Sequence, residues 1–166
     1  MTPSTPVPDQ RHRAVPDHPD IRVPPPLLYL SVLGIALLLQ EVAPLPWLPR
    51  AQTRPFAVVC FVSCVVLALW AVAWFRRART SPLPIRPAAA LITDGPFRFS
   101  RNPLYLSLVL LYVGITLWLG VLWPIVLLPA LVFLVQQLVI LREEAYLECR
   151  FDEAYRAYRA RVRRWL

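Results

Sequence analysis

TDGPFRFSRNPLY, residues 93–105, separates two uncharged apolar segments that are each long enough to cross a membrane. Asp94-Gly95-Pro96 favours a turn, because Gly adopts positive φ readily and Pro fixes φ at the next position. Asn102-Pro103 favours the start of a helix, since Asn is a good N-cap and Pro is tolerated in the first helical turn. The stretch therefore predicts a short connection that ends where a membrane helix begins.

Arg101 lies beside the predicted N-terminus of that helix. Unpaired N–H groups and the helix dipole favour an anion at such a position. One interpretation is therefore a carboxylate or phosphate that is held jointly by Arg101 and the helix start. The other is a membrane-proximal arginine in contact with lipid phosphate. This stretch alone favours neither.

Apolar residues make up 57% of the 166 residues, which is too much for an ordinary soluble domain and predicts an all-α, polytopic membrane protein. The net charge of +8 comes from arginines that flank the apolar segments, so membrane orientation explains it better than nucleic-acid binding. His12 and His18, the two histidines, both precede the first apolar segment, which argues against a His-ligated metal in the membrane body.

About four transmembrane helices are predicted. Residues 1–23 are Pro-rich and predict a disordered tail, and residues 24–75 hold the first two spans, Leu27–Ala43 and Phe56–Phe75. The uncharged run from residue 104 to 141 would be roughly 57 Å long as one helix, nearly two bilayer cores. Gly120 and Pro124 interrupt it, which predicts a tight hairpin of helices 104–119 and 121–141. Gly114 and Gly120 would permit close helix contact.

The arginines predict the orientation. Three lie in the tail, two follow the first span, six lie between the second span and Pro103, none lies in the hairpin turn and seven follow Leu141. With four spans, the connection at residues 76–102 lies on the same side as both termini. The positive-inside rule makes that side cytoplasmic, and we expect the protein in a bacterial inner membrane.

Residues 142–166 predict a charged, amphipathic cytoplasmic helix. Its apolar positions recur at spacings of three and four. Glu144, Glu148 and Asp152 form a second stripe at a spacing of four, where like charges repel, so a cation should lie opposite. Arg98, Arg101 or a cationic ligand would supply it; alternatively, the stripe is a solvated face balanced by Arg156 and Arg159. The predicted apolar stripe comprises Leu147, Phe151, Ala154, Tyr158, Val162 and Trp165.

Two segments resemble a known family. GPFRFSRNPLY, residues 95–105, is similar to the motif Gly-Pro-Tyr-Arg-x-x-Arg-His/Asn-Pro-x-Tyr, and residues 143–165 resemble a C-terminal signature that begins Glu-Glu and ends Arg-Trp. Both belong to integral-membrane methyltransferases, which include isoprenylcysteine carboxyl methyltransferase and bacterial phospholipid methyltransferases. Thr80-Ser81-Pro82-Leu83-Pro84 looks like the proline-containing loop of the same family. The resemblance covers residues 76–166, the predicted methyltransferase core.

The resemblance implies S-adenosylmethionine as methyl donor, bound in a cytoplasmic pocket that the C-terminal helix closes. It implies a lipophilic acceptor from the bilayer, either an isoprenylcysteine-like carboxylate or a lipid headgroup. Arg101 and the helix start would hold the cofactor carboxylate, Glu143 or Glu144 its amino group or ribose, and Tyr155 its sulfonium through a cation–π contact. Arg101 and Glu144 are thus the candidate catalytic residues. The candidate cofactor-binding residues are Gly95, Arg98, Arg101, Asn102, Pro103, Tyr105, Glu143, Glu144 and Tyr155.

The proton chemistry stays open. A carboxylate acceptor is already a nucleophile at neutral pH, whereas an ammonium headgroup must first lose a proton, which Asp94, Glu144 or no residue would accept. Two departures from the family bear on this core. Asp152 stands where the family usually has Gly, which predicts a more regular helix there. Val139 stands where the isoprenylcysteine enzymes, as aligned here, have an Arg, which weighs against an isoprenylcysteine acceptor if that Arg holds the acceptor carboxylate.

Two other functions compete with methyl transfer. One is a non-enzymatic membrane scaffold whose arginines bind anionic lipid. The other is a nicotinamide-dependent reductase, because membrane sterol reductases resemble the same core; they are much larger, and this sequence has no second cofactor motif. The sequence does not choose an oligomeric state.

Overall fold

The computed structural model describes Pro19, residues 23–81 and residues 88–166. Most of the predicted tail, residues 1–23, lies outside the described residues, and so do the prolines of the predicted loop at positions 82, 84 and 87. The described residues form α1 (Pro25–Val42), α2 (Arg50–Arg77), the 3₁₀ turn η1 (Gly95–Arg98), α3 (Pro103–Leu119), α4 (Trp123–Val135), the π-helical segment η2 (Gln136–Ile140) and α5 (Leu141–Arg161).

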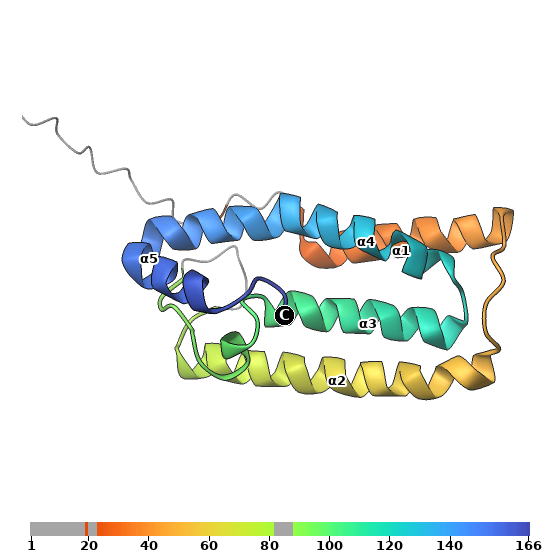
Figure 1. The fold of residues 1–166 in the computed structure, drawn as a ribbon, viewed down its shortest axis with the longest axis horizontal. Helices are drawn as coiled ribbons and strands as arrows, with labels where there is room; N and C mark the ends of the chain where they lie inside the picture. The colour runs from red at the N-terminus through yellow and green to blue at the C-terminus, as the bar shows by residue number, and fades with distance from the viewer. Residues whose placement is uncertain (1–18, 20–22, 82–87) are drawn as a thin grey trace, which may run out of the picture.

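The all-α membrane fold is as predicted. α1, α2 and the continuous helix α4–η2–α5 are each long and apolar enough to cross a membrane. α3 is apolar but has 17 residues, about 25 Å at 1.5 Å per residue. The part of α5 beyond Leu141 is rich in charged side chains, so we place the end of the span formed by α4 and η2 near that residue. Figure 1 shows the four long rods side by side, with η1, the end of α5 and the C-terminus gathered at one end.

The helices pack as two pairs, α2 with α3 and α1 with α4. The short turn between α3 and α4 is as predicted, and Gly120 adopts the left-handed conformation (φ +64°) that ends α3. The close contact predicted at Gly114, however, is with α2: a Cβ there would lie 2.6 Å from the ring of Phe61. A membrane helix is apolar on all sides, so hydrophobic periodicity does not reveal which neighbour it meets.

Polar side chains fasten the end of the bundle that carries the α3–α4 turn. Arg50 Nε donates a 2.9 Å hydrogen bond to the Leu119 carbonyl, which has no partner within its own helix. Trp123 Nε1 donates one of 2.7 Å to the carbonyl of Ala43. The turns at this end therefore tie α1 to α4 and α2 to α3, which leaves the opposite end to hold the loops.

The outer faces of α1 and α2 carry large apolar side chains that are largely exposed. On α2, Phe56, Val62 and Leu69 are each more than half exposed, as is Leu38 on α1. Exposed apolar surface of this extent is unfavourable in water and favourable against lipid chains. The faces therefore support a bilayer environment.

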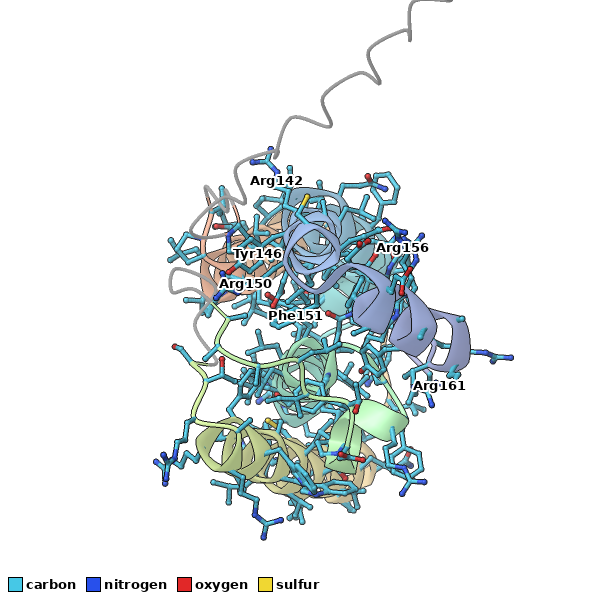
Figure 2. The ribbon with its side chains drawn as sticks, turned by 90° about the vertical axis from the view of Figure 1, so that its left-hand side faces the viewer. Arg142, Tyr146, Arg150, Phe151, Arg156 and Arg161 are labelled. Atoms are coloured by element: carbon cyan, nitrogen blue, oxygen red, sulfur yellow. The ribbon has the colours of Figure 1, made fainter. Side chains whose placement is uncertain are left out.

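α5 departs from the predicted regular helix over 142–166. Asp152 has φ +40° and ψ −114°, which kinks the helix, and α5 ends at Arg161. Figure 2 shows the part after Phe151 turning away from the axis of the first part. The expectation that Asp in place of Gly makes this helix more regular is therefore wrong: the helix kinks at Asp152, and an aspartate adopts a positive-φ conformation that glycine accepts more easily.

The kink also changes the predicted apolar stripe. Leu147, Phe151, Tyr158 and Val162 pack in one cluster as expected, together with Tyr155, which is buried. Ala154 is exposed, because the rotation at Asp152 turns it to solvent. Trp165 lies beyond the helix and packs against the other core cluster, beside Tyr29, Tyr112 and Ile140.

Candidate functional site

The site is built around Glu144 at the start of α5. Arg101 Nη1 lies 3.0 Å from Glu144 Oε1. Arg164 donates from Nε to Oε1 (2.9 Å) and from Nη2 to Oε2 (2.8 Å). Glu144 is only 6% exposed, and a carboxylate buried to that degree is stable only when paired and hydrogen-bonded. The predicted proximity of Arg101 to Glu144 is thus confirmed, and the cation opposite the acidic stripe is Arg101 together with Arg164.

The other two carboxylates of the stripe follow the alternative interpretation. Glu148 pairs with Arg156 and Arg159 at 3.2 Å each, and Asp152 pairs with Arg156 at 2.7 Å. All of these side chains are at least one-third exposed, so the pairs form a solvated surface network. Only Glu144 belongs to the interior.

Arg101 has donor capacity that the described residues do not use. Its Nη1 also donates a 3.2 Å hydrogen bond to the Tyr155 hydroxyl. Its Nε is buried and has no hydrogen-bond partner within the described ranges. A buried, unpaired guanidinium N–H is costly unless something accepts from it, which marks this nitrogen as a place for an acceptor atom of a ligand.

The C-terminal segment after α5 holds the start of α3. The Arg101 amide donates to the Arg163 carbonyl (3.0 Å), and the Ser100 hydroxyl donates to the Arg164 carbonyl (3.2 Å). Asn102 Nδ2 donates to the same Arg164 carbonyl at 3.0 Å. Asn102 occupies the predicted N-cap position, but its side chain makes no capping hydrogen bond. The reason is that its amide faces the C-terminal segment, which sequence periodicity alone did not reveal.

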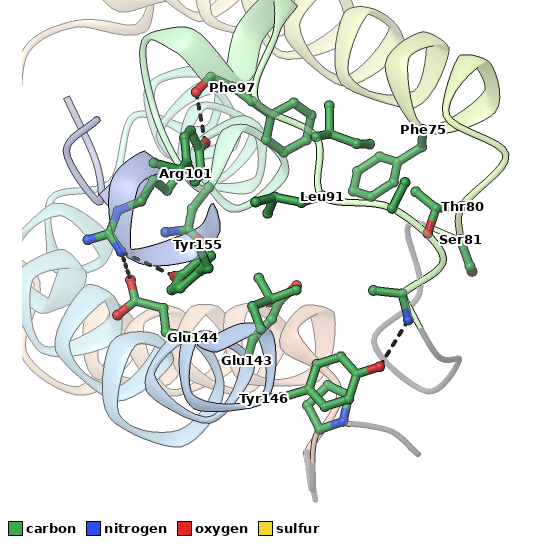
Figure 3. A pocket seen from close by; sticks show the side chains of 17 residues that line it. Phe75, Thr80, Ser81, Leu91, Phe97, Arg101, Glu143, Glu144, Tyr146 and Tyr155 are labelled. Carbon is green, nitrogen blue, oxygen red and sulfur yellow. Dashed lines mark hydrogen bonds and ion pairs between the residues drawn. The ribbon is translucent and has the colours of Figure 1, made fainter. Parts of the chain in front are cut away.

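A cavity of about 90 Å³ lies between α5, η1 and residues 88–92 (Figure 3). Most of its lining is apolar, and we call it the polar cavity because the charged side chains of Arg101, Glu143 and Glu144 also line it. Tyr146 accepts a 3.0 Å hydrogen bond from the Ala88 amide, and Tyr158 donates one of 2.8 Å to the Phe97 carbonyl, so both tyrosines fix the walls. Its lining includes Phe75, Leu91, Phe97, Arg101, Asn102, Glu143, Glu144, Tyr146, Leu147, Tyr155 and Tyr158.

A second, mainly apolar cavity of about 250 Å³ adjoins the first on the side of α1 and α3. Phe75, Phe97, Arg101, Asn102 and Glu143 line both cavities and so form their common wall. The remaining lining of the apolar cavity comes from Pro25, Pro26, Pro103, Leu104, Tyr105, Ser107 and Leu108. A polar space and an apolar space therefore meet at three polar side chains.

Glu143 is the carboxylate in the common wall. Its Oε2 accepts a 2.8 Å hydrogen bond from the Tyr105 hydroxyl. Burial raises the pKa of the Glu143 carboxyl above its ordinary value; the Tyr105 hydrogen bond opposes this rise, and the charge of Glu144 adds to it. Glu143 thus has a different environment from Glu144, whose two oxygens are taken by guanidinium groups.

The structure separates the predicted site residues into groups. Arg101, Asn102 and Glu143 line both cavities; Glu144 and Tyr155 line the polar one; Pro103 and Tyr105 line the apolar one. Tyr105 thus lies on the apolar side, and its hydroxyl bonds to Glu143 in the common wall.

Gly95 and Arg98 line neither cavity. Gly95 has φ +62° and lies against Trp74, so its role in the fold is to permit a close turn. Arg98 is exposed. Asp94, a candidate base, is also exposed and lines neither cavity.

Arg164 and Tyr146 are the site residues for which sequence analysis assigned no role. The charge spacing predicted a cation opposite Glu144, but Arg164 lies in a segment that was expected to be helical, so its return to the site was not foreseen. Tyr146 lies outside the stripe pattern, and no sequence signal pointed to it.

Comparisons with known proteins show the family of this chain. The chain is 48% identical to an uncharacterized protein of Haemophilus influenzae over 65 residues, which is 38% of this chain and 100% of that protein. No solved structure gives a significant match. The profile of the phospholipid methyltransferase family matches residues 53–154, which include Arg101, Glu143 and Glu144 and end before Tyr155 and Arg164. The chain therefore belongs to the phospholipid methyltransferase family, and it is a membrane methyltransferase.

Proposed function

We propose that this protein transfers a methyl group from S-adenosylmethionine to a lipophilic acceptor that reaches the site from the membrane. The observation that carries the proposal is the common wall of Arg101, Asn102 and Glu143 between a polar and an apolar cavity. A methyl transfer needs one charged cofactor and one acceptor atom in line with it, and two adjoining spaces of different polarity suit that pair.

The donor set of the polar cavity fits S-adenosylmethionine. The unpartnered Nε of Arg101, in a cluster where two guanidinium groups share the one carboxylate of Glu144, suits the cofactor carboxylate. The ring of Tyr155 suits its sulfonium. When bound, the cofactor would supply a methyl group on a positively charged sulfur.

The protein's own contribution would be positioning and exclusion of water. Tyr158 and Tyr146 fix the walls of the polar cavity, and apolar side chains such as Leu104 and Leu108 keep water from the acceptor side. Both effects favour an in-line transfer, because the two reactants are held together and charge on the sulfur is not stabilised by water.

Glu143 is the residue we propose as proton acceptor when the acceptor is an amine. Asp94 is exposed and away from both cavities, and both oxygens of Glu144 are bonded to arginines. Glu143, in the common wall, has neither restriction. An acceptor that is a carboxylate would need no base, so the dependence of the rate on Glu143 distinguishes a lipid amine from an isoprenylcysteine-like acid.

The arginine distribution supports a cytoplasmic location for this site. The connection with Arg76, Arg77 and Arg79, and the C-terminal segment with Arg163 and Arg164, lie at the same end of the bundle (Figure 1). On the positive-inside rule we propose that this end of the bundle faces the cytoplasm, with the protein in a bacterial inner membrane and both termini cytoplasmic.

Calorimetric titration of the detergent-purified protein with S-adenosylhomocysteine tests the cofactor. We expect saturable binding that Arg101→Ala weakens. Incubation with methyl-tritiated S-adenosylmethionine and extracted lipids then tests the transfer, with label expected in a lipid fraction. If the protein binds neither the cofactor nor its product saturably but is retained on anionic vesicles, the result would support the lipid-binding scaffold instead.

A further inference from the structure

The side chain of Arg164 is fixed by its own segment. The Arg164 carbonyl accepts from Ser100 and Asn102, and the neighbouring Trp165 donates a 3.2 Å hydrogen bond from Nε1 to Gln136 Oε1. Together with the hydrogen bond from the Arg101 amide to the Arg163 carbonyl, these contacts tie the backbone on both sides of the Arg164 side chain to the start of α3, and the Trp165 side chain to η2. The guanidinium is consequently held in a fixed position, from which it donates two hydrogen bonds to Glu144. The Arg164 side chain is 25% exposed.

The two arginines share the carboxylate oxygens of Glu144 unequally. Arg164 contacts both oxygens, whereas Arg101 contacts Oε1 through a single nitrogen. Without Arg164, the natural arrangement of Arg101 and Glu144 would be the paired, two-bond geometry that guanidinium and carboxylate prefer. Arg101 would then be neutralised and turned from the cavity.

We propose that Arg164 is a positioning residue, which by occupying both oxygens of Glu144 keeps the charge and the free Nε of Arg101 available to the carboxylate of the cofactor. The inference rests on the proposed function, because it assumes an anionic group at Arg101. It assigns a role to the segment after α5, which lies outside the part of the chain that the family profile matches.

The experiment compares two ligands by calorimetry. S-adenosylhomocysteine carries the amino-acid carboxylate, and 5′-methylthioadenosine has the same nucleoside thioether without it. We expect Arg164→Ala to weaken binding of the first by about tenfold or more, the usual effect of losing a charged hydrogen bond, and to leave binding of the second within about twofold. Arg163→Ala, which removes an exposed side chain and keeps the backbone carbonyl that binds Arg101, should change neither.

A double-mutant cycle tests whether Arg164 acts through Arg101. In an Arg101→Ala background, Arg164→Ala should cause no further loss of S-adenosylhomocysteine affinity. If Arg164→Ala fails to fold, Arg164→Lys is the deciding variant. Lysine keeps the charge but cannot make two parallel hydrogen bonds to Glu144. This variant too should weaken binding only of the ligand that carries a carboxylate.

Equal losses for both ligands, no loss for either, or an additive loss in the double variant would each overturn the positioning role while leaving the proposed function in place. Wild-type protein that binds neither ligand would instead overturn the proposed function, and the inference with it.

Discussion

Arg101 and Glu144 form a 3.0 Å ion pair that joins the start of α3 to the start of α5. The two side chains are the meeting point of the segments that the family motifs occupy, and Tyr155 and Arg164 each bond to one of them. The pair is buried, so its loss should cost more stability than the loss of the surface pairs of the same helix.

Glu144→Ala is expected to destabilise the protein strongly. It would leave Arg101, whose side chain is 9% exposed, without its carboxylate, and breaking a buried pair typically costs about 3–5 kcal/mol. Glu148→Ala is the matched control on the same helix: its partners are half exposed, and the loss should stay below about 1 kcal/mol. Thermal unfolding in detergent measures both. Equal midpoints for the two variants would show that Glu144 is not part of a buried network.

Asp152→Gly is expected to stabilise the fold. Asp152 at φ +40° occupies a backbone region that glycine adopts freely, and such a residue costs about 1–3 kcal/mol. Loss of its exposed pair with Arg156 offsets up to about 1 kcal/mol of that gain. Asp152→Ala removes the same carboxylate and keeps a Cβ, so the glycine variant should unfold at a higher temperature than the alanine variant. The reverse order would contradict the kink at this position.

Gly95→Ala is expected to destabilise the connection before α3. A Cβ would lie 2.1 Å from Trp74 Nε1, and φ is +62°, so we expect a loss of about 1–3 kcal/mol. Gly34→Ala serves as control, because no atom lies within 4 Å of the added Cβ and alanine is the better helix former. The unfolding midpoint should fall in Gly95→Ala and should stay the same or rise in Gly34→Ala. A fall in both would mean that the clash at Trp74 is not the cause.

Glu143 is expected to make stability depend on pH. Its pKa is raised in the folded state, so the folded protein holds this proton more tightly than the unfolded chain does. The stability from this group is therefore fully present below the ordinary Glu pKa of about 4.3 and is lost as the pH rises through the raised value.

Comparison with Glu143→Gln isolates this effect. The neutral amide cannot titrate, so as the pH rises above about 4 the unfolding midpoint of wild-type protein should fall relative to that of the variant. Parallel pH profiles would show that burial does not perturb Glu143.

The sequence was sufficient for those features that single residues or compositions determine. An uncharged run such as residues 56–75 must be a helix in a bilayer, because no other structure satisfies its backbone there. Gly120 ends α3 in the left-handed conformation that its lack of a Cβ permits. Charge repulsion in one helix and the count of spans made Arg101 one candidate partner of Glu144, beside Arg98, a cationic ligand and a solvated face.

The remaining features depend on tertiary contacts that leave little trace in local sequence. The C-terminal segment leaves its helix because backbone groups of Arg163 and Arg164 are bonded to the start of α3, and no pattern within residues 162–166 records that partner. Helix pairing was equally hidden, since side chains that face lipid and side chains that face α2 are both apolar.

The most direct test of a cofactor site shared by the two family segments is a calorimetric titration of S-adenosylhomocysteine into wild-type protein, Arg101→Ala and Arg98→Ala in one detergent. Arg98 belongs to the same motif but is exposed and lines neither cavity, so it is the matched control. We predict saturable binding to wild-type protein, binding weakened about tenfold or more in Arg101→Ala, and unchanged binding in Arg98→Ala. Equal affinity in all three proteins, or the loss in Arg98→Ala alone, would contradict the site.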